Sequence, residues 1–140
     1  MSKRNPIAKI VRLREIRERA ARAEMAQALG EESEAERALR VAEDRRRAER
    51  EVAGLLRPAE LRALHLQGYR LHEIVTDAAA RHELARDRLA STRETWRLAA
   101  ADLESAENLA DRRRRAAAAA ARTAAERALD DLQIARQERR

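Results

Sequence analysis

Three histidines are the side chains in this sequence best suited to metal binding or acid–base chemistry. His65 and His72 are seven residues apart, a spacing that places both on one face of a helix. A zinc site needs further ligands, and neither a cysteine nor a suitably spaced carboxylate joins this pair. We therefore expect His65, His72 and His82 to be solvated or to lie between helices, with no metal bound.

Other catalytic chemistry finds little support in the sequence. The few serines and threonines have no histidine and aspartate in a plausible register, so a nucleophilic site lacks its components. The sequence also has no glycine-rich loop that would hold phosphates. Two paired helices would offer no concave pocket that excludes water. We expect a protein that is not an enzyme and that uses no cofactor.

Basic side chains gather towards both ends of the chain. Residues 1–22 hold eight Lys or Arg against two Glu, and residues 111–140 hold nine against five acidic residues. Residues 23–110, in contrast, hold fourteen basic and eighteen acidic residues. The basic ends are able to bind phosphates by counterion release. Interleaved acids and the lack of base-stacking aromatics argue against nucleic acid as the partner.

The composition indicates which elements carry these side chains. Of the 140 residues, 40% are charged and 1% are aromatic, and Ala, Glu, Arg and Leu dominate. This profile is typical of long helices and coiled coils. Intrinsic disorder is the alternative for so charged a chain, but only three Gly and two Pro interrupt it. We expect one coiled-coil domain over residues 1–140.

A seven-residue repeat organises the second half of the chain. From Leu61, in alternating steps of three and four, small or apolar residues recur at most positions as far as Ala110. Such a stripe is stable only when another helix covers it. The larger side chains expected in the seam between the helices are Leu39, Leu64, Leu71, Val75, Leu89, Trp96 and Leu103.

The first helix has a less regular pattern. One apolar face is formed by Ile10, Leu13, Ile16 and Ala20. A cleaner repeat follows at Ala21, Met25, Ala28, Ala35, Leu39 and Ala42. Glu32 takes one seam position of this repeat, and we expect a phase slip between the two stretches. The stripe is expected to resume at Val52 and Leu55, and Gly30 is expected to soften the helix without ending it.

A turn is predicted at about residues 54–58. Gly54 suits the left-handed residue past a helix end, Pro58 suits a first helical turn, and Glu60 would face the positive end of the helix dipole. The two helices are predicted at about 7–54 and about 59–138. Because a short connection makes them neighbours, the expected fold is an all-α, antiparallel two-helix coiled-coil hairpin with a longer second helix. A homodimeric coiled coil without this turn is the alternative.

The second helix is expected to outlast its partner. Helix one would cover it as far as about Asp111, and the residues beyond would extend alone or find a partner elsewhere. The alanines from Ala116 to Ala121 favour helix without packing. Since a hairpin brings both termini to one end, the basic segments 1–22 and 111–140 would meet there.

The sequence favours a cytoplasmic location. It has no cysteine, its first residues lack the apolar stretch of a secretory signal, and no run approaches 18 apolar residues.

Several segments together resemble a known family. Residues 96–103 (Trp-Arg-Leu-Ala-Ala-Ala-Asp-Leu) and 107–112 (Glu-Asn-Leu-Ala-Asp-Arg) are similar to the C-terminal helix of the FliJ family of soluble flagellar type III export proteins. In that family an aromatic residue and an Ala/Leu heptad precede an E-x-L-x-x-R signature. Residues 129–132 (Leu-Asp-Asp-Leu) and 35–41 (Ala-Glu-Arg-Ala-Leu-Arg-Val) resemble the family too. The likeness covers most of the chain and depends on the order and spacing of these segments.

This resemblance implies an antiparallel coiled coil similar to the central stalk of rotary ATPases. The end that bears the termini would enter the pore of the hexameric export ATPase, FliI. Other parts would contact the cytoplasmic region of the export gate protein FlhA and bind export chaperones. The ring contact is expected at Arg12, Arg14, Arg17, Arg19, Arg112, Arg113, Arg114 and Arg115. The gate or chaperone contact is expected at Tyr69, Leu71, Ile74 and Ala78.

The chain departs from the family at the gate contact. Family members with a mapped gate surface carry aromatics late in helix one and just after the turn. Here the positions near Arg45 and Glu49 are charged, and Tyr69 is the only aromatic nearby. The resulting hypothesis is a non-enzymatic stalk and adaptor that couples the ATPase ring to the gate, cytoplasmic and membrane-associated only through the export apparatus. An injectisome-type stalk and a basic nucleic-acid-binding coiled coil are the alternatives.

Overall fold

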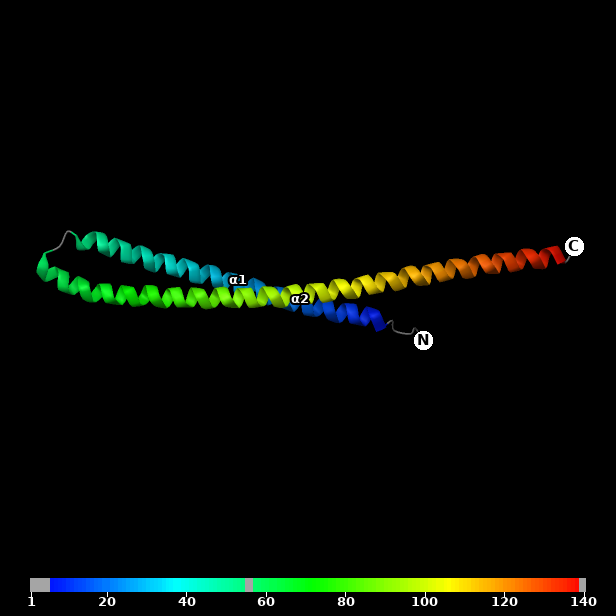
Figure 1. Cartoon of the computed structure of the whole chain (residues 1–140), viewed down its shortest axis with the longest axis horizontal. Coiled ribbons are helices and arrows are strands. Elements are labelled where there is room, and N and C mark those ends of the chain that lie inside the picture. The colour runs from blue at the N-terminus through cyan, green and yellow to red at the C-terminus, as the bar shows by residue number, and fades with distance from the viewer. Residues whose placement is uncertain (1–5, 55–56, 139–140) are drawn as a thin grey trace. The chain divides into compact units, whose positions relative to one another are not determined.

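The computed structural model describes residues 6–54 and 57–138, and within them the chain forms two helices and no strand. Helix α1 spans Pro6–Ala53 and helix α2 spans Pro58–Glu138. Each helix begins and ends at the predicted residue or one residue from it. The helices pack against each other in antiparallel directions (Figure 1). The predicted all-α hairpin with a longer second helix is therefore confirmed.

The chain divides into two compact units, so the single domain stays a prediction. The described part of residues 1–18 and 99–140 forms one unit, and residues 19–98 form the other. Each unit contains a segment of α1 packed along a segment of α2. In the first unit the Arg14 guanidinium donates a hydrogen bond from Nη1 to the Asp102 carbonyl oxygen at 2.6 Å.

The start of α2 is fixed by a local cap. The Arg57 carbonyl oxygen accepts hydrogen bonds from the backbone N–H groups of Glu60 at 3.0 Å and Leu61 at 3.1 Å. The Glu60 carboxylate in turn accepts a hydrogen bond from the Arg57 N–H at 3.2 Å, as in a capping box. Glu60 thus stabilises the start of α2 through a direct hydrogen bond, in addition to the predicted interaction with the helix dipole.

The predicted role of Gly54 is wrong. Among the described glycines none has a positive φ, so α1 ends at Ala53 without a left-handed cap. The Arg57–Glu60 cap fixes the entry into α2 instead. Leu55 and Leu56, in the middle of the predicted turn, lie outside the described residues.

The α2 seam agrees with its prediction at every position. Each residue of the alternating three–four repeat from Leu61 to Ala110 is buried or half-buried. Between residues 58 and 138 the only other positions that are not exposed are Ala100 and Asp111. All seven larger seam side chains named from the sequence are buried or half-buried, with Leu89 only 7% exposed.

The α1 seam differs from its prediction. The expected face is exposed, at 45% for Ile10, 50% for Leu13 and 57% for Ile16, and Ala20 is exposed as well. One unbroken repeat instead runs along α1 through Ile7, Val11, Arg14, Glu18, Ala21, Met25, Ala28, Glu32, Ala35, Leu39, Ala42, Arg46, Glu49 and Ala53. There is no phase slip and α1 continues through Gly30.

Charged residues explain that difference. Arg14, Glu18 and Glu32 take seam positions, where Arg14 bonds to the Asp102 carbonyl, Glu32 meets His82, and Glu18 is only 5% exposed. Because these seam residues are charged, the seven-residue repeat of α1 is not recognised from the bulky apolar residues alone. At the other end Val52 is exposed and Ala53 takes the seam position, so the expected resumption at Val52 is wrong, and Leu55 lies outside the described residues.

The two seams fit by size. A Cβ built on Gly68 would lie 3.5 Å from the Glu49 Oε1 atom, which sets these two residues opposite each other. We call such a facing pair of seam residues a layer. Counting from the Glu49–Gly68 layer along both seams in alternating steps of three and four pairs a small residue with a large one in most layers. In the second unit these layers include Ala21 with Trp96, Ala28 with Leu89, Ala35 with His82, Leu39 with Ala78 and Ala42 with Val75.

The paired region ends where it was predicted to end. In the first unit, the same stepping places Ile7 opposite Ala110, and Asp111 is the last residue of α2 that is not exposed. From residue 112 to residue 138 every side chain is exposed and the chain stays helical. We call residues 112–138 the α2 extension.

Candidate functional site

The α2 extension is an exposed helix with a distinctive composition. It opens on Arg112 to Arg115 and continues with six alanines, whose intrinsic preference for helix offsets the lack of packing. Arg114 pairs with Asp111, the last half-buried residue, in an i,i+3 ion pair. The four arginine side chains therefore stand on the surface directly past the end of the seam.

The basic residues expected to contact a ring lie mostly in one unit. Arg12, Arg14 and Arg17 share the first compact unit with the run from Arg112 to Arg115, whereas Arg19 belongs to the second. Arg12, Arg17 and Arg19 are exposed. Arg14 is half-buried in the seam, where it bonds to the Asp102 carbonyl, so its guanidinium is already engaged within the chain.

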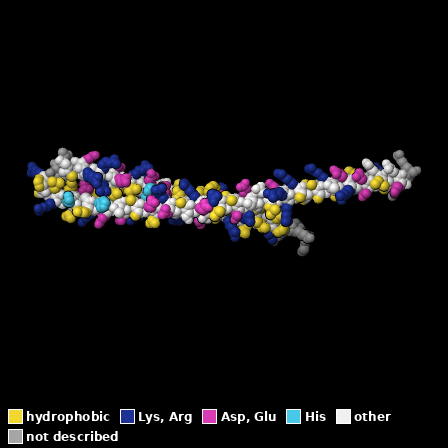
Figure 2. Space-filling view, in the orientation of Figure 1, with side chains coloured by type: hydrophobic (Ala, Val, Ile, Leu, Met, Phe, Trp, Pro, Cys, Tyr) yellow, Lys and Arg dark blue, Asp and Glu magenta, His cyan; other side chains and the backbone are white. Residues whose placement is uncertain are grey.

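An exposed apolar surface lies beside these arginines, and the sequence pattern did not predict it. Ile10, Leu13 and Ile16 point away from the seam, and we call them the N-terminal apolar face. Figure 2 shows hydrophobic side chains among Lys and Arg on this part of the molecule. The helical spacing of these three residues predicts a seam, because the charged residues of the true seam hide its repeat.

The expected gate residues do not form one accessible surface. Tyr69 and Ile74 are exposed, at 67% and 47%, while Leu71 is half-buried and Ala78 is buried between the helices. The Tyr69 ring meets the His65 ring edge-on, with centroids 6.2 Å apart. A partner can therefore reach Tyr69 and Ile74 directly, but it can reach Ala78 only by separating α1 from α2.

A groove opens beside the seam near the start of α2. Its volume is about 480 Å³, and Leu61, Leu64 and Gly68 line it together with Tyr69. Its remaining lining residues are Arg46, Glu49, Arg50, Ala53, His65 and His72. The Oε2 atom of Glu49 is buried here without a hydrogen-bond partner. Gly68 leaves space here that a side chain would fill. The groove is open to solvent, so the expectation that paired helices offer no pocket that excludes water stays a prediction.

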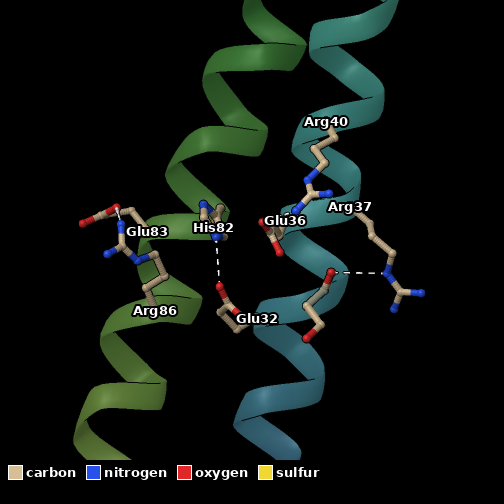
Figure 3. A network of polar contacts seen from close by, with 8 residues as sticks. Glu32, Glu36, Arg37, Arg40, His82, Glu83 and Arg86 are labelled. Atoms are coloured by element: carbon tan, nitrogen blue, oxygen red, sulfur yellow. Dashed lines mark hydrogen bonds and ion pairs between the residues drawn. The ribbon is translucent and has the colours of Figure 1, made fainter.

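The third histidine takes part in a polar layer within the seam (Figure 3). His82 on α2 and Glu32 on α1 meet through Nε2 and Oε1 at 3.1 Å, and both side chains are 19% exposed. Nearby, Arg88 donates from Nη1 to the Glu31 carboxylate at 2.6 Å. These contacts join the two helices within the second unit. The expectation that His82 lies between helices is confirmed.

Ion pairs within each helix cover the outer faces. A hydrogen bond from Arg40, strengthened by its charge, lowers the pKa of Glu36, and the same pair raises the pKa of Arg40. Arg97 likewise lowers the pKa of Glu94 by donating hydrogen bonds of 2.7 and 3.0 Å. Both pairs are exposed, so they support single helices and contribute little to the hairpin.

Other features of the described residues bear on the class of site. No group of three His, Cys, Asp or Glu side chains within residues 6–54 and 57–138 is arranged to hold a metal ion. No helix in that part of the chain is long and apolar enough to cross a membrane.

Comparisons with protein-family models, curated proteins and solved structures give no match for this chain. The resemblance to the FliJ family therefore stays a hypothesis based on the sequence. The structure offers three surfaces for binding. They are the α2 extension with its basic start, the N-terminal apolar face, and the groove at the start of α2.

Proposed function

We propose that this protein is a non-enzymatic stalk and adaptor of a flagellar type III export apparatus. In this proposal it acts on the cytoplasmic side, where it engages the hexameric export ATPase and couples it to the export gate and its chaperones. Association with the membrane is then indirect, through the gate.

The observation that carries the proposal is the α2 extension. A stalk that enters a ring needs a helix that stays ordered without a partner from its own chain and that offers its whole circumference to the ring. Residues 112–138 are exposed on all sides and helical throughout. The alanine run supplies the required helix preference.

Charge supports the ring as the partner of this segment. Arg112, Arg113 and Arg115 are exposed, and Arg12 and Arg17 add basic charge in the same unit. Such a cluster steers association towards an acidic surface and speeds the encounter at low salt. We assign the ring contact to these five side chains and to Arg19 and Arg114, with Arg14 serving the hairpin.

The gate or chaperone contact is assigned to the start of α2. Tyr69 and Ile74 are exposed apolar side chains there, and the groove beside Tyr69 offers a recess for a partner side chain. Leu71 contributes only the edge that the seam leaves uncovered, and Ala78 acts as a packing residue.

An ATPase assay on charge variants tests the ring contact. The export ATPase, recovered with the full-length protein from a cytoplasmic extract, is assayed with the natural chain and with the R112Q/R113Q/R114Q/R115Q variant. We expect the natural chain to stimulate hydrolysis or ring assembly, and we expect the variant to lose most of that effect. The matched control is R45Q/R47Q/R81Q/R86Q, which removes four exposed arginines away from the α2 extension and should keep the effect.

Two outcomes would replace the proposal. Stimulation of an injectisome ATPase, with none of the flagellar enzyme, would assign the chain to that related system. A DNA affinity that falls steeply with salt, together with no effect on any ring ATPase, would favour the nucleic-acid-binding alternative.

A further inference from the structure

The seam of the second unit is covered less completely near the turn than in its middle. Ala42 on α1 and Ala78 on α2, at 4% and 9% exposed, are the buried residues nearest to the turn. Among the described residues of 43–77 the seam positions are only half-buried and all other positions are exposed. We call residues 46–53 of α1 and 61–71 of α2 the turn-end segment.

Two neighbouring layers of the turn-end segment place a charged residue of α1 in the seam. Arg46 lies opposite Leu71, and Glu49 lies opposite Gly68. The Glu49 Oε2 atom is buried without a hydrogen-bond partner, and Glu49 also lines the groove of about 480 Å³. A buried carboxylate oxygen without a donor destabilises the closed hairpin. The packing contacts that the groove leaves unmade weaken it further.

Hydrogen bonds between the helices do not compensate for these defects. Glu32 meets His82 and Glu31 meets Arg88, but both pairs lie on the side of Ala42 that faces away from the turn. Among the described residues, no side-chain hydrogen bond or ion pair joins the α1 part of the turn-end segment to its α2 part. Contacts between half-buried side chains therefore hold this segment closed.

We propose that the turn-end segment opens as a unit while the rest of the second unit stays paired. In the open state α1 and α2 separate from the turn as far as Arg46, and Ala42 sets the limit because complete burial begins there. Glu49 then becomes solvated, and the seam sides of Leu64 and Leu71 become accessible. This inference concerns the hairpin itself and does not depend on the proposed export function.

Hydrogen exchange on the full-length chain tests the proposal. The separated helix ends lose the tertiary support that short helices need, so their amide protons exchange through the open state. We expect residues 46–53 and 61–71 to exchange faster than residues 28–42 and 75–89 by about tenfold or more. Mass spectrometry of peptides from the exchanged chain measures both rates.

Replacing Glu49 distinguishes this opening from simple fraying of the helix ends. E49L removes the unpartnered carboxylate and keeps a side chain opposite Gly68, so exchange in the turn-end segment should slow by about tenfold. Exchange in residues 28–35 and 82–89 should not change. The matched control is E51L, at an exposed site two residues further along α1, which should leave exchange in the turn-end segment as it is. Light scattering checks that both variants keep the mass of the natural chain.

Spin-label distances detect the open state directly, because the chain has no cysteine of its own. Val52 and Gln67 are exposed beside the seam, and Ala38 and Arg81 are exposed at the equivalent places two heptads further from the turn. Labels on V52C/Q67C should give a broad distribution with a longer distance that E49L removes. Labels on A38C/R81C should give one narrow distance with or without E49L. Electron paramagnetic resonance measures both pairs.

Several results would overturn the proposal. One is equal exchange in the turn-end segment and in residues 28–42, and another is an equally narrow distance for the two label pairs. Faster exchange that E49L leaves unchanged would show fraying of the helix ends. A slowing by E49L that extends equally to residues 82–89 would show that the whole hairpin opens at once.

Discussion

Two stretches of α2 are continuous in backbone but opposite in environment. Between residues 58 and 111 one side chain in every three or four is covered by α1, and the rest face solvent. Between residues 112 and 138 all side chains face solvent, yet the helix does not end. The first stretch depends on tertiary contacts, whereas the second depends on the intrinsic preference of its residues for helix.

A single long helix can therefore serve two purposes. Packing fixes the position of the first stretch and makes its stability a property of the whole hairpin. The α2 extension has no such coupling, so its side chains are able to change with little effect on folding. A binding surface in the α2 extension can therefore change without disturbing the packing of the seam.

The largest expected difference between the stretches comes from removing a leucine. L89A removes a side chain that is 7% exposed and packs opposite the fully buried Ala28, so we expect the free energy of unfolding to fall by about 2–3 kcal/mol. L132A in the α2 extension should change it by less than about 0.5 kcal/mol. Urea denaturation followed by circular dichroism measures both, and equal losses would show that the extension is packed.

Polar contacts should show the same contrast on a smaller scale. E32Q weakens the contact with His82, in which both side chains are 19% exposed, and we expect a loss of about 1–2 kcal/mol. E94Q removes an exposed ion pair with Arg97 on a single helix and should cost less than about 0.5 kcal/mol. A double-mutant cycle with H82Q isolates the interhelical term, and a coupling near zero would contradict the polar layer.

Glycine substitutions separate global from local stability. A80G, at an exposed site in the paired stretch, should lower the global free energy of unfolding by about 1 kcal/mol. A119G carries the same intrinsic cost, but in the α2 extension it should speed amide hydrogen exchange there without changing the global value. Exchange measured by mass spectrometry on both variants decides whether the extension opens independently.

Replacing glycines by alanine should give the smallest effects. A Cβ at Gly30 would meet no atom within 4 Å, so G30A should stabilise the hairpin by about 0.5–1 kcal/mol. G68A should gain less, because its Cβ would contact the Glu49 carboxylate at 3.5 Å in the seam. Thermal unfolding compares the two, and a larger gain for G68A would show that the groove there collapses around the methyl group.

The α2 seam was predictable because its residues are small or apolar at nearly every step. Only His82 and Thr92 are polar there, and neither disturbs the pattern. The start of α1 was not predictable in the same way. Ile10, Leu13 and Ile16 have the composition of a buried face, while the true seam contains Arg14 and Glu18.

The candidate site was predicted only in part. The exposed basic run after Asp111 follows from the sequence, because the lengths of the two helices determine where pairing ends. The groove near Gly68 and the engagement of Arg14 with Asp102 depend on which residues face each other across the seam. This alignment of α1 with α2 depends on both helices together, so the apolar pattern of one helix does not predict it.

The alternation of small and large seam residues has a mechanical consequence. On α1 the alanines at 21, 28, 35 and 42 repeat every seven residues, as do Val75, His82, Leu89 and Trp96 on α2. A sliding motion of one heptad, about 10 Å along the axis, would place His82, Leu89 and Trp96 each against another of these alanines. Steric fit alone therefore permits several axial positions. The bond between His82 and Glu32 and the short connection between the helices select one of them.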